Sequence, residues 1–586
     1  MRNKILSIFC LLLALVITVS ALGACSGKEP VDNPSSDISS KITSSEEQVT
    51  SAESIPSDES SSDNISSEET NDDTWYDNLE NNDADEDTEY DDMLKASLNI
   101  YNSEAVQDDF MGLGGVYHAF PYRSDIYGRQ YTEKMAEAEI KRVINSGITL
   151  ARTTYSIDDS WDSKTKSFNW ESDTMQAIYK YCLGLKEGGV EVLINHWYSS
   201  NYLFTTYPWA DDDGKVTKPG VQNECHESIR VPGDQQATLE NFAEFMAETV
   251  RQLRAHGCTN ATTFSIATEP YATWKEEWAD FISNDEIKDA ASKDIAWALN
   301  TVNSNFKKAG IRNLVKIMGP NFAGDSDATL YYKYFKKHID KDACDLISLH
   351  KYYGNELIKD NYDLWKECTL DYKTEVGSFK NFVWDEYNCS PSAEKSIAYR
   401  HNAYNGTQLA LAQLCFMNYG MKGSFIWSLL DQQWPNNSST SLDSFRDGVH
   451  MCGTAPTFLQ SSIVFPPYYS FSLVANIVGE KGSKIYRGDD DTYEGVYAAM
   501  AENKDGELSI LVASTNITET ELELKFEKSL GGKTFYRHVY NPNDIVCTAE
   551  GELIVPDLKL TNATTVLKDV IDPYCVVVYT TKKVYK

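Results

Sequence analysis

The chain reads FSIATEP at residues 264–270 and FVWDEYN at residues 382–388, and in each stretch a glutamate stands just past the end of a short apolar run. Both runs have the length and composition of buried strands, and Glu269 and Glu386 stand at their carboxyl ends. If both are strands of one parallel barrel, the two carboxyls open at the same rim. The fold prediction therefore depends on what surrounds these runs.

Short apolar runs alternate with helical periodicity from about residue 106 to 478. The predicted strands are Met111–Tyr117, Thr149–Thr153, Glu191–His196, Thr263–Thr268, Val315–Gly319, Leu346–His350, Phe382–Glu386 and Gly423–Trp427. Predicted helices include Glu133–Asn145, Leu239–His256 and Tyr404–Asn418, and Tyr469–Ile477 is the last. Eight strand–helix repeats predict an α/β fold, a (β/α)8 TIM barrel.

The sequence pattern changes after the last predicted helix. Short alternating strands with turn signals follow, including Glu507–Thr515, Thr520–Phe526 and Tyr574–Thr581. They predict a C-terminal antiparallel β-sandwich, and the upstream stretch 98–101 is a candidate for a further strand of it. The predicted domains are a signal peptide (1–24), a tether (25–93), the barrel (94–478) and the sandwich (479–586).

The N-terminus has a targeting pattern. A short basic region precedes an apolar run at residues 5–21, and Leu22-Gly23-Ala24-Cys25 ends it. This resembles the lipobox of bacterial lipoproteins, which implies lipidation of Cys25 and anchoring on the extracytoplasmic face of the cell membrane. A plain signal peptide or an N-terminal membrane anchor is the alternative. No other apolar run reaches the length of about 18 residues that a transmembrane helix needs.

The predicted tether carries most of the chain's negative charge. Residues 26–93 hold 22 acidic and 2 basic residues, so they account for −20 of the formal −35. A segment so charged and so poor in apolar residues is not expected to fold. The acidity argues against a nucleic-acid partner, because phosphate backbones repel it.

The cysteines give no sign of a metal site. Ten of the twelve remain when Cys10 and Cys25 are set aside, and none forms a Cys-x-x-Cys pair. They are expected to be buried free thiols, with one or two disulfides left open. No Gly-rich phosphate loop follows a strand, and neither cofactor nor metal is predicted. The acidic run 489–491 is interpreted as a solvated turn rather than a calcium site.

Polar and aromatic residues stand at six predicted strand ends. They are Arg152, His196, Trp197, Thr268, Glu269, His350, Tyr352, Glu386 and Trp427, with Gln432 and Trp434 shortly after. A retaining glycosidase needs one protonated carboxyl, one ionised carboxylate, a cation or hydroxyl to aim the latter, and an aromatic floor. Each residue alone also has an ordinary structural explanation, such as an ion pair or a core position.

The strand order resembles glycoside hydrolase clan A, with an acid/base Glu after strand 4 and a nucleophile Glu after strand 7. The barrel-plus-sandwich layout is similar to families 39, 30, 51 and 79, and residues 384–388 look like the nucleophile motif of families 39 and 51. The resemblance implies Glu269 as acid/base and Glu386 as nucleophile, with Arg152 and Tyr352 on the nucleophile. It also implies that His196 and His350 line the cleavage subsite and that Trp427 stacks on the sugar.

Two neighbours of the glutamates qualify this picture. The clan usually has Asn before the acid/base, where this chain has Thr268, so the identity of the sugar stays open; an axial 2-hydroxyl, as in mannose, is one option. Asp385 competes with Glu386, but strand alternation predicts that only one of them faces the barrel interior.

The sequence thus predicts a monomeric, lipid-anchored retaining glycoside hydrolase for β-linked polysaccharides or oligosaccharides. Aromatic loops around Trp197, Trp209 and Trp434 favour an extended cleft and endo action. One alternative is a non-catalytic carbohydrate-binding lipoprotein, which would have two hinged lobes instead of a barrel. Another is a transglycosylase that remodels glycans, which would have the same residues and different products.

Overall fold

The computed structural model describes residues 93–116, 133–196, 206–210, 216–221, 226–270, 285–322, 326–352, 360–389, 402–427, 429, 464–545 and 552–584. The predicted signal peptide and tether, with Cys25, lie outside these residues. So do three predicted site residues, Trp197, Gln432 and Trp434. Among the described residues, no helix combines the length and apolar character that crossing a membrane requires.

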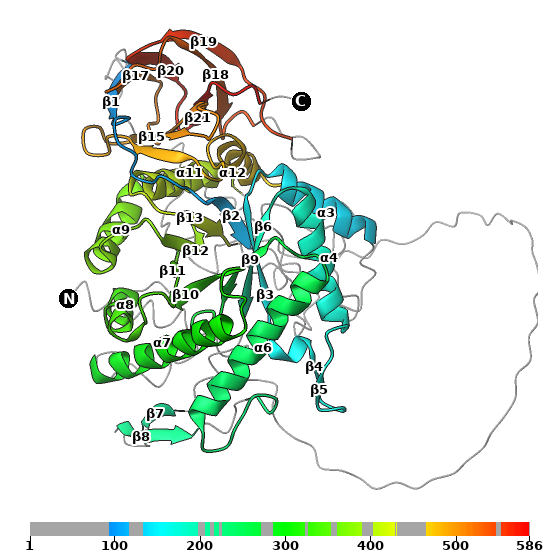
Figure 1. Ribbon diagram of the computed structural model, residues 1–586. Helices are drawn as coiled ribbons and strands as arrows, with labels where there is room; N and C mark the ends of the chain where they lie inside the picture. Colours follow the sequence, from blue (N-terminus) through cyan, green and yellow to red (C-terminus); the bar gives the residue numbers. More distant parts are fainter. Residues whose placement is uncertain are drawn as a thin grey trace, which may run out of the picture. The chain divides into compact units, whose positions relative to one another are not determined.

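Eight parallel strands close into a barrel, as predicted (Figure 1). In chain order they are β2 (Gly112–Val116), β3 (Leu150–Tyr155), β6 (Glu191–His196), β9 (Ala261–Ser265), β10 (Lys316–Phe322), β11 (Leu346–Tyr352), β12 (Phe382–Asn388) and β13 (Gly423–Ile426). Each strand pairs with the next, and β13 closes on β2. Because all eight run the same way, their carboxyl ends share one rim.

Helices alternate with these strands. They are α3 (Glu133–Asn145), α4 (Asp173–Glu187), α6 (Gln235–Ala255), α7 (Asp285–Lys308), α8 (Ser326–His338), α9 (Tyr362–Val376), α11 (Ala403–Asn418) and α12 (Pro466–Ile477). Polar side chains start several of them: Ser172 accepts from the Met175 N–H and Asp234 from the Ala237 N–H. Such caps satisfy backbone donors that the first helical turn leaves free. Two short hairpins, β4–β5 (Trp161–Asp162, Ser167–Phe168) and β7–β8 (Thr206–Ala210, Val216–Val221), lie outside the barrel sheet.

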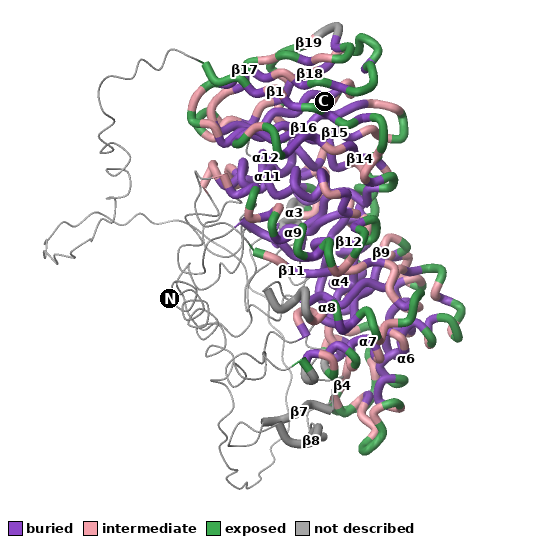
Figure 2. The backbone as a smooth tube through the Cα atoms, turned by 90° about the vertical axis from the view of Figure 1, so that its left-hand side faces the viewer, coloured by how far each residue is buried: buried purple, intermediate pink, exposed green. Residues whose placement is uncertain are grey.

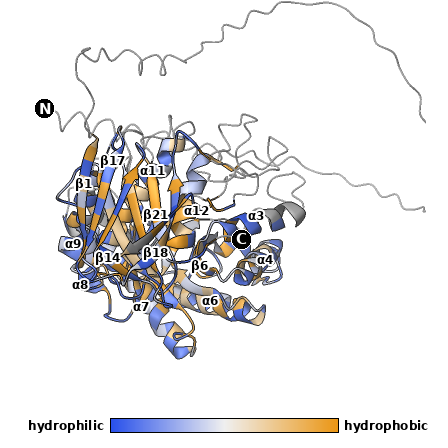
Figure 3. Ribbon diagram, turned by 90° about the horizontal axis from the view of Figure 1, so that it is seen from above, coloured by the Kyte–Doolittle hydropathy of each residue, from blue (hydrophilic) through white to orange (hydrophobic). Residues whose placement is uncertain are grey.

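The C-terminal part forms two sheets, as predicted. One has six strands in the order β14 (Lys484–Arg487), β15 (Val496–Glu502), β16 (Leu508–Ser514), β21 (Val576–Thr580), β18 (Lys533–Tyr540) and β19 (Leu558–Ala563). The other is β1 (Leu94–Ile100), β17 (Thr520–Phe526) and β20 (Val566–Ile571). Apolar side chains of both sheets share one core, and the ribbon of β21 has the orange of hydrophobic residues in Figure 3. Strand β1 pairs with β17, so residues 94–100 belong to this sandwich and the barrel begins after them.

Helix α11 joins the barrel to the sandwich. Every residue from Asn405 to Asn418 is buried, as the purple tube of Figure 2 shows. The helix contacts β13 and α9 on one side and β14, β15 and β16 on the other. Its side chains are small, apolar or hydrogen-bonded polar groups, which is what burial on all sides requires. At Gly406 a Cβ atom would lie 2.6 Å from the Tyr540 ring, so glycine permits this close approach.

The expectation of a solvated turn at residues 489–491 was wrong. Asp489 and Asp490 are 6% and 5% exposed. Asp490 accepts a 3.1 Å hydrogen bond from the Tyr362 hydroxyl of α9 and pairs with Arg487 at 2.5 Å. Because these partners come from both domains, the acidic run fastens the sandwich to the barrel. The seven described cysteines are free thiols, six of them buried.

Candidate active site

The barrel interior is filled below its rim by an apolar layer. One side chain comes from each of seven neighbouring segments: Met111, Leu150, Leu193, Met318, Leu346, Val383 and Phe425. Strand alternation then turns the residue two positions further along toward the interior again. Above Leu150, Leu193, Leu346 and Val383 these residues are Arg152, Asn195, Ser348 and Asp385. A polar layer therefore lies on the apolar floor, just under the rim.

Two bulges modify the alternation at this level. In β12 the pairing jumps from Trp384 to Glu386, which leaves Asp385 as an extra residue. In β10 it jumps from Pro320 to Phe322, which leaves Asn321 extra, with a left-handed φ of 59°. A bulge lets successive side chains turn to the same side. The prediction that only one of Asp385 and Glu386 faces inward was therefore wrong, because both contact Arg152.

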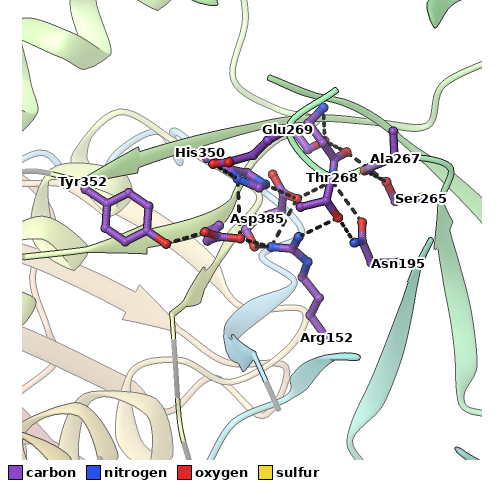
Figure 4. A network of polar contacts seen from close by, with 12 residues as sticks. Arg152, Asn195, Ser265, Ala267, Thr268, Glu269, His350, Tyr352 and Asp385 are labelled. Atoms are coloured by element: carbon purple, nitrogen blue, oxygen red, sulfur yellow. Dashed lines mark hydrogen bonds and ion pairs between the residues drawn. The ribbon is translucent and has the colours of Figure 1, made fainter. Parts of the chain in front are cut away.

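Glu386 is held by two donors, one from the neighbouring strand β11 and one from β3, three strands away around the barrel. Arg152 Nη1 lies 2.8 Å from its Oε2, and the Tyr352 hydroxyl donates a short hydrogen bond to Oε1 (Figure 4). Burial raises the pKa of the Glu386 carboxyl, as does the charge of Glu269, while His350, Arg152 and Tyr352 act to lower it. Burial also raises the pKa of the Tyr352 phenol, which keeps its proton for donation.

Glu269 is held from below and from the side. It follows the end of β9 in a left-handed conformation with φ 41°, and its N–H donates to the Asn321 carbonyl at 3.1 Å. Its Oε1 lies 3.0 Å from His350 Nδ1. The side chain of Glu269 is 32% exposed, against 7% for Glu386. Glu269 is thus the more open of the two carboxyls.

His350 stands between the carboxyls. Nδ1 lies 3.0 Å from Glu269 Oε1 and 3.5 Å from Glu386 Oε2, and Nε2 lies 3.2 Å from Asp385 Oδ2. Burial acts to lower the pKa of His350, but the charges of Glu386 and Asp385 outweigh it and raise that pKa to about 10. The ring is therefore an imidazolium at neutral pH and donates from both nitrogens.

The two glutamates are close together. One oxygen of each and one ring nitrogen of His350 all lie within 4.8 Å of one another. Such a trio could in principle hold a metal ion. Here both His350 nitrogens carry protons and Glu386 already pairs with Arg152, so the cluster is better suited to proton transfer and nucleophilic attack than to ligating a cation.

Three residues outside the predicted set of site residues organise the polar layer. Asn321 donates to Asp385 Oδ2 at 2.6 Å and to Asn195 Oδ1 at 3.3 Å. Its own Oδ1 accepts from Ser265 at 3.0 Å and Ser348 at 2.5 Å. The three residues are Asn195, Asn321 and Asp385, all 0% exposed. The sequence prediction missed the first two and considered Asp385 only as a competitor of Glu386. Alternation from Leu193 and Val383 could have indicated Asn195 and Asp385, whereas the bulge that turns Asn321 inward has no clear sequence signal.

The structure places His196 differently from the prediction. Its ring packs edge-on against Tyr155, Phe242 and Phe245. Phe242 and Phe245 belong to α6, so His196 points outward between barrel and helices while Asn195 points inward. Burial lowers the pKa of His196 to about 3, so the ring is neutral. Neither ring nitrogen hydrogen-bonds to any part of the chain that the structure describes.

Trp427 follows the end of β13 and is 9% exposed. Its N–H donates to the Tyr387 carbonyl at 3.0 Å, and its own carbonyl accepts from Asn388. These bonds tie the backbone of Trp427 to β12, the strand that carries Glu386. Its predicted role as a sugar platform stays a prediction.

The barrel and the C-terminal sheets together form an architecture that this chain shares with solved glycoside hydrolases. The catalytic domain of GH30 xylanase C from Talaromyces cellulolyticus matches with a TM-score of 0.54 at 10% identity, over 83% of this chain and 99% of that one. An α-L-arabinofuranosidase from Thermotoga maritima, solved with arabinose, matches with a TM-score of 0.53 at 14% identity, over 83% and 99%. An endo-β1,6-glucanase matches with a TM-score of 0.53 at 11% identity, over 84% and 96%.

At such low identity these matches establish the fold and not the reaction. No protein-family model and no curated protein matches the sequence. The names of the three matched proteins refer to three different glycans, so the shared fold does not select a sugar.

Proposed function

We propose that this protein is a retaining glycoside hydrolase. The observation that carries the proposal is the spacing of Glu269 and Glu386, whose nearest oxygens lie within 4.8 Å. Retaining enzymes hold their two carboxyl groups about 5–5.5 Å apart, whereas inverting enzymes need about 6.5–9.5 Å to admit a water. The spacing suits direct attack by one carboxylate.

Glu386 is the proposed nucleophile. Donors on both oxygens, from Arg152 and Tyr352, favour the carboxylate and aim it. Attack on the anomeric carbon forms a glycosyl ester as the bond to the leaving oxygen breaks. Water then hydrolyses the ester and restores the carboxylate.

Glu269 is the proposed acid/base. Two cations, Arg152 and His350, face three carboxyls in this cluster. Two cations balance Asp385 and Glu386 as carboxylates, so electrostatics permit Glu269 to keep a proton. In the first step it gives that proton to the leaving oxygen, and in the second it takes one from water.

The substrate class and location extend the proposal beyond the site. We propose a β-linked polysaccharide or its oligosaccharides, cleaved internally, at the outer face of a membrane to which Cys25 is lipidated. Support comes from the aromatic residues of the loops and from the N-terminal pattern. A Cys25→Ser variant should lose incorporation of labelled fatty acid and leave the membrane fraction.

The enzymatic proposal is tested with polysaccharides and aryl β-glycosides, followed by chromatography of the products. Wild-type protein should release sugars of retained configuration, and a Glu386→Gln variant should release none. Products longer than the substrate would indicate transfer to sugar instead of water. If purified wild-type protein binds glycans of the panel but cleaves none, a non-catalytic binding protein replaces the proposal.

A further inference from the structure

A chain of hydrogen bonds runs through the buried polar layer and ends at Thr268, next to Glu269 (Figure 4). It begins at Asp385, which lies 3.8 Å from the Arg152 guanidinium and accepts from His350. An ionised carboxylate can only accept hydrogen bonds, so its contact with Asn321 at 2.6 Å must involve the Asn321 amide nitrogen. This contact fixes the orientation of the Asn321 amide.

The orientation of the Asn321 amide also determines the orientation of the Asn195 amide. The same Asn321 nitrogen lies 3.3 Å from Asn195, which must therefore present its oxygen to Asn321. The amide nitrogen of Asn195 then faces Thr268 and donates a short hydrogen bond to its hydroxyl oxygen. The orientation of the Asn321 amide, and through it that of the Asn195 amide, thus follows from the carboxylate of Asp385.

Thr268 receives a second donor from the opposite side. Arg152 Nη2 lies 3.4 Å from the Thr268 hydroxyl oxygen, and a guanidinium has no acceptor. A hydroxyl has two acceptor positions and one proton. Both acceptor positions are taken by groups that can only donate, so the proton of Thr268 has to go to a third group.

Nothing in the described part of the chain accepts that proton, and Thr268 is partly exposed. Arg152 also connects Thr268 directly to the proposed nucleophile, since its Nη1 binds Glu386 while its Nη2 binds Thr268. The Thr268 hydroxyl is therefore available to donate a hydrogen bond beside Glu269 and Glu386, where a bound sugar would be cleaved.

We infer that Thr268 is a specificity-determining residue whose hydroxyl acts only as a donor, to an acceptor oxygen of the sugar bound over Glu269 and Glu386. The inference rests on the proposed function. An amide in the same place would offer both a donor and an acceptor. Thr268 would instead favour ligands that present an oxygen at this point and penalise ligands that lack one.

The test compares wild type with Thr268→Val, which keeps the shape and removes the hydroxyl, and with Thr268→Ser, which keeps the hydroxyl. The probes are the aryl glycoside that wild type cleaves fastest and its set of monodeoxy and deoxyfluoro analogues. On the parent glycoside, Thr268→Val should lose roughly 10- to 100-fold in kcat/KM, and Thr268→Ser should stay within about threefold of wild type.

The decisive quantity is the wild-type to Thr268→Val ratio of kcat/KM across the analogues. This ratio should be no more than about three for the one monodeoxy analogue that lacks the accepting oxygen, and it should stay at roughly 10 to 100 for the other analogues. The matching deoxyfluoro analogue, which can accept but not donate, should retain part of the ratio. A disturbance of Arg152 or Asn195 alone would lower every substrate equally. A ratio that is constant across the analogues therefore overturns the inference, while wild-type turnover of the parent glycoside reports the proposed function separately.

Discussion

The N–H of Glu269 donates a 3.1 Å hydrogen bond to the carbonyl oxygen of Asn321, so the bulge in β10 holds the backbone of the proposed acid/base. The Asn321 side chain meanwhile binds Asp385, the residue before Glu386. One residue therefore touches the segments that carry both proposed catalytic carboxyls. Their spacing depends on three strands, β9, β10 and β12, being in register.

Replacement of Asn321 should separate its two roles. Asn321→Gly keeps the left-handed backbone and removes the amide, whereas Asn321→Asp places a second carboxyl against Asp385. We expect both to lower kcat, and Asn321→Asp to be less stable by about 2–4 kcal/mol at pH 7, because one buried charge is left unpaired. Chemical denaturation gives the free energies of unfolding. Equal stability of the two variants would contradict a buried, ionised Asp385.

Glu386→Gln should remove turnover while the protein stays folded. The amide fills the same space but cannot form the glycosyl ester, so kcat should fall by about 10⁴-fold or more. Steady-state kinetics measure the loss, and circular dichroism checks the fold. An activated 2-deoxy-2-fluoroglycoside should label wild type on the peptide that contains Glu386. Label on another peptide would assign the nucleophile elsewhere.

Glu269→Ala should spare substrates whose leaving group needs no proton. We expect 2,4-dinitrophenyl glycosides to form the ester at near wild-type rates and natural linkages to be cleaved at least about 100-fold more slowly. Azide should accelerate the variant by attacking the ester and release a glycosyl azide of retained configuration. Glu171→Ala, at an exposed glutamate of the same barrel, is the matched control and should behave as wild type.

His350 should make stability fall at alkaline pH. Its pKa in the folded protein is about 10, above the value of about 6.5 for an unfolded chain. The resulting stabilisation is fully present below about pH 6.5 and is lost as pH rises through 10. Thermal midpoints of wild type and His350→Gln should therefore converge between pH 7 and 10. A constant difference across that range would show that His350 is not charged.

The contact between barrel and sandwich should not tolerate a larger side chain at Gly406 without loss of stability. A Cβ there would lie 2.6 Å from the Tyr540 ring, so Gly406→Ala should destabilise the protein by about 1–3 kcal/mol. Shortening the ring with Tyr540→Leu should restore part of that loss in the double variant, as a double-mutant cycle of unfolding free energies would show. Independent effects of the two changes would contradict the contact.

Much of the fold could be predicted from local pattern. Helix α3 and strands β6 and β17 have the predicted bounds, because periodicity and propensity act within a few residues. Site residues could be predicted where alternation continued undisturbed, as for Arg152. The same alternation places Asn195 inward and His196 outward, so the prediction of His196 as a site residue was wrong. Alternation from Val383 places Asp385 inward, but it could not predict that the bulge at Asp385 turns Glu386 to the same side.

The sequence by itself determined the order of strands and helices, the barrel and sandwich classes, and the two glutamates at the ends of the fourth and seventh predicted strands. These features follow from hydrophobic burial, because the pattern of apolar residues within a single segment indicates which of its side chains are buried. Only the tertiary structure decided that Asn195, Asn321 and Asp385 meet beneath those glutamates and orient the Thr268 hydroxyl. The bonds that join them span 64 to 126 residues of chain and depend on register between strands, which no local pattern encodes.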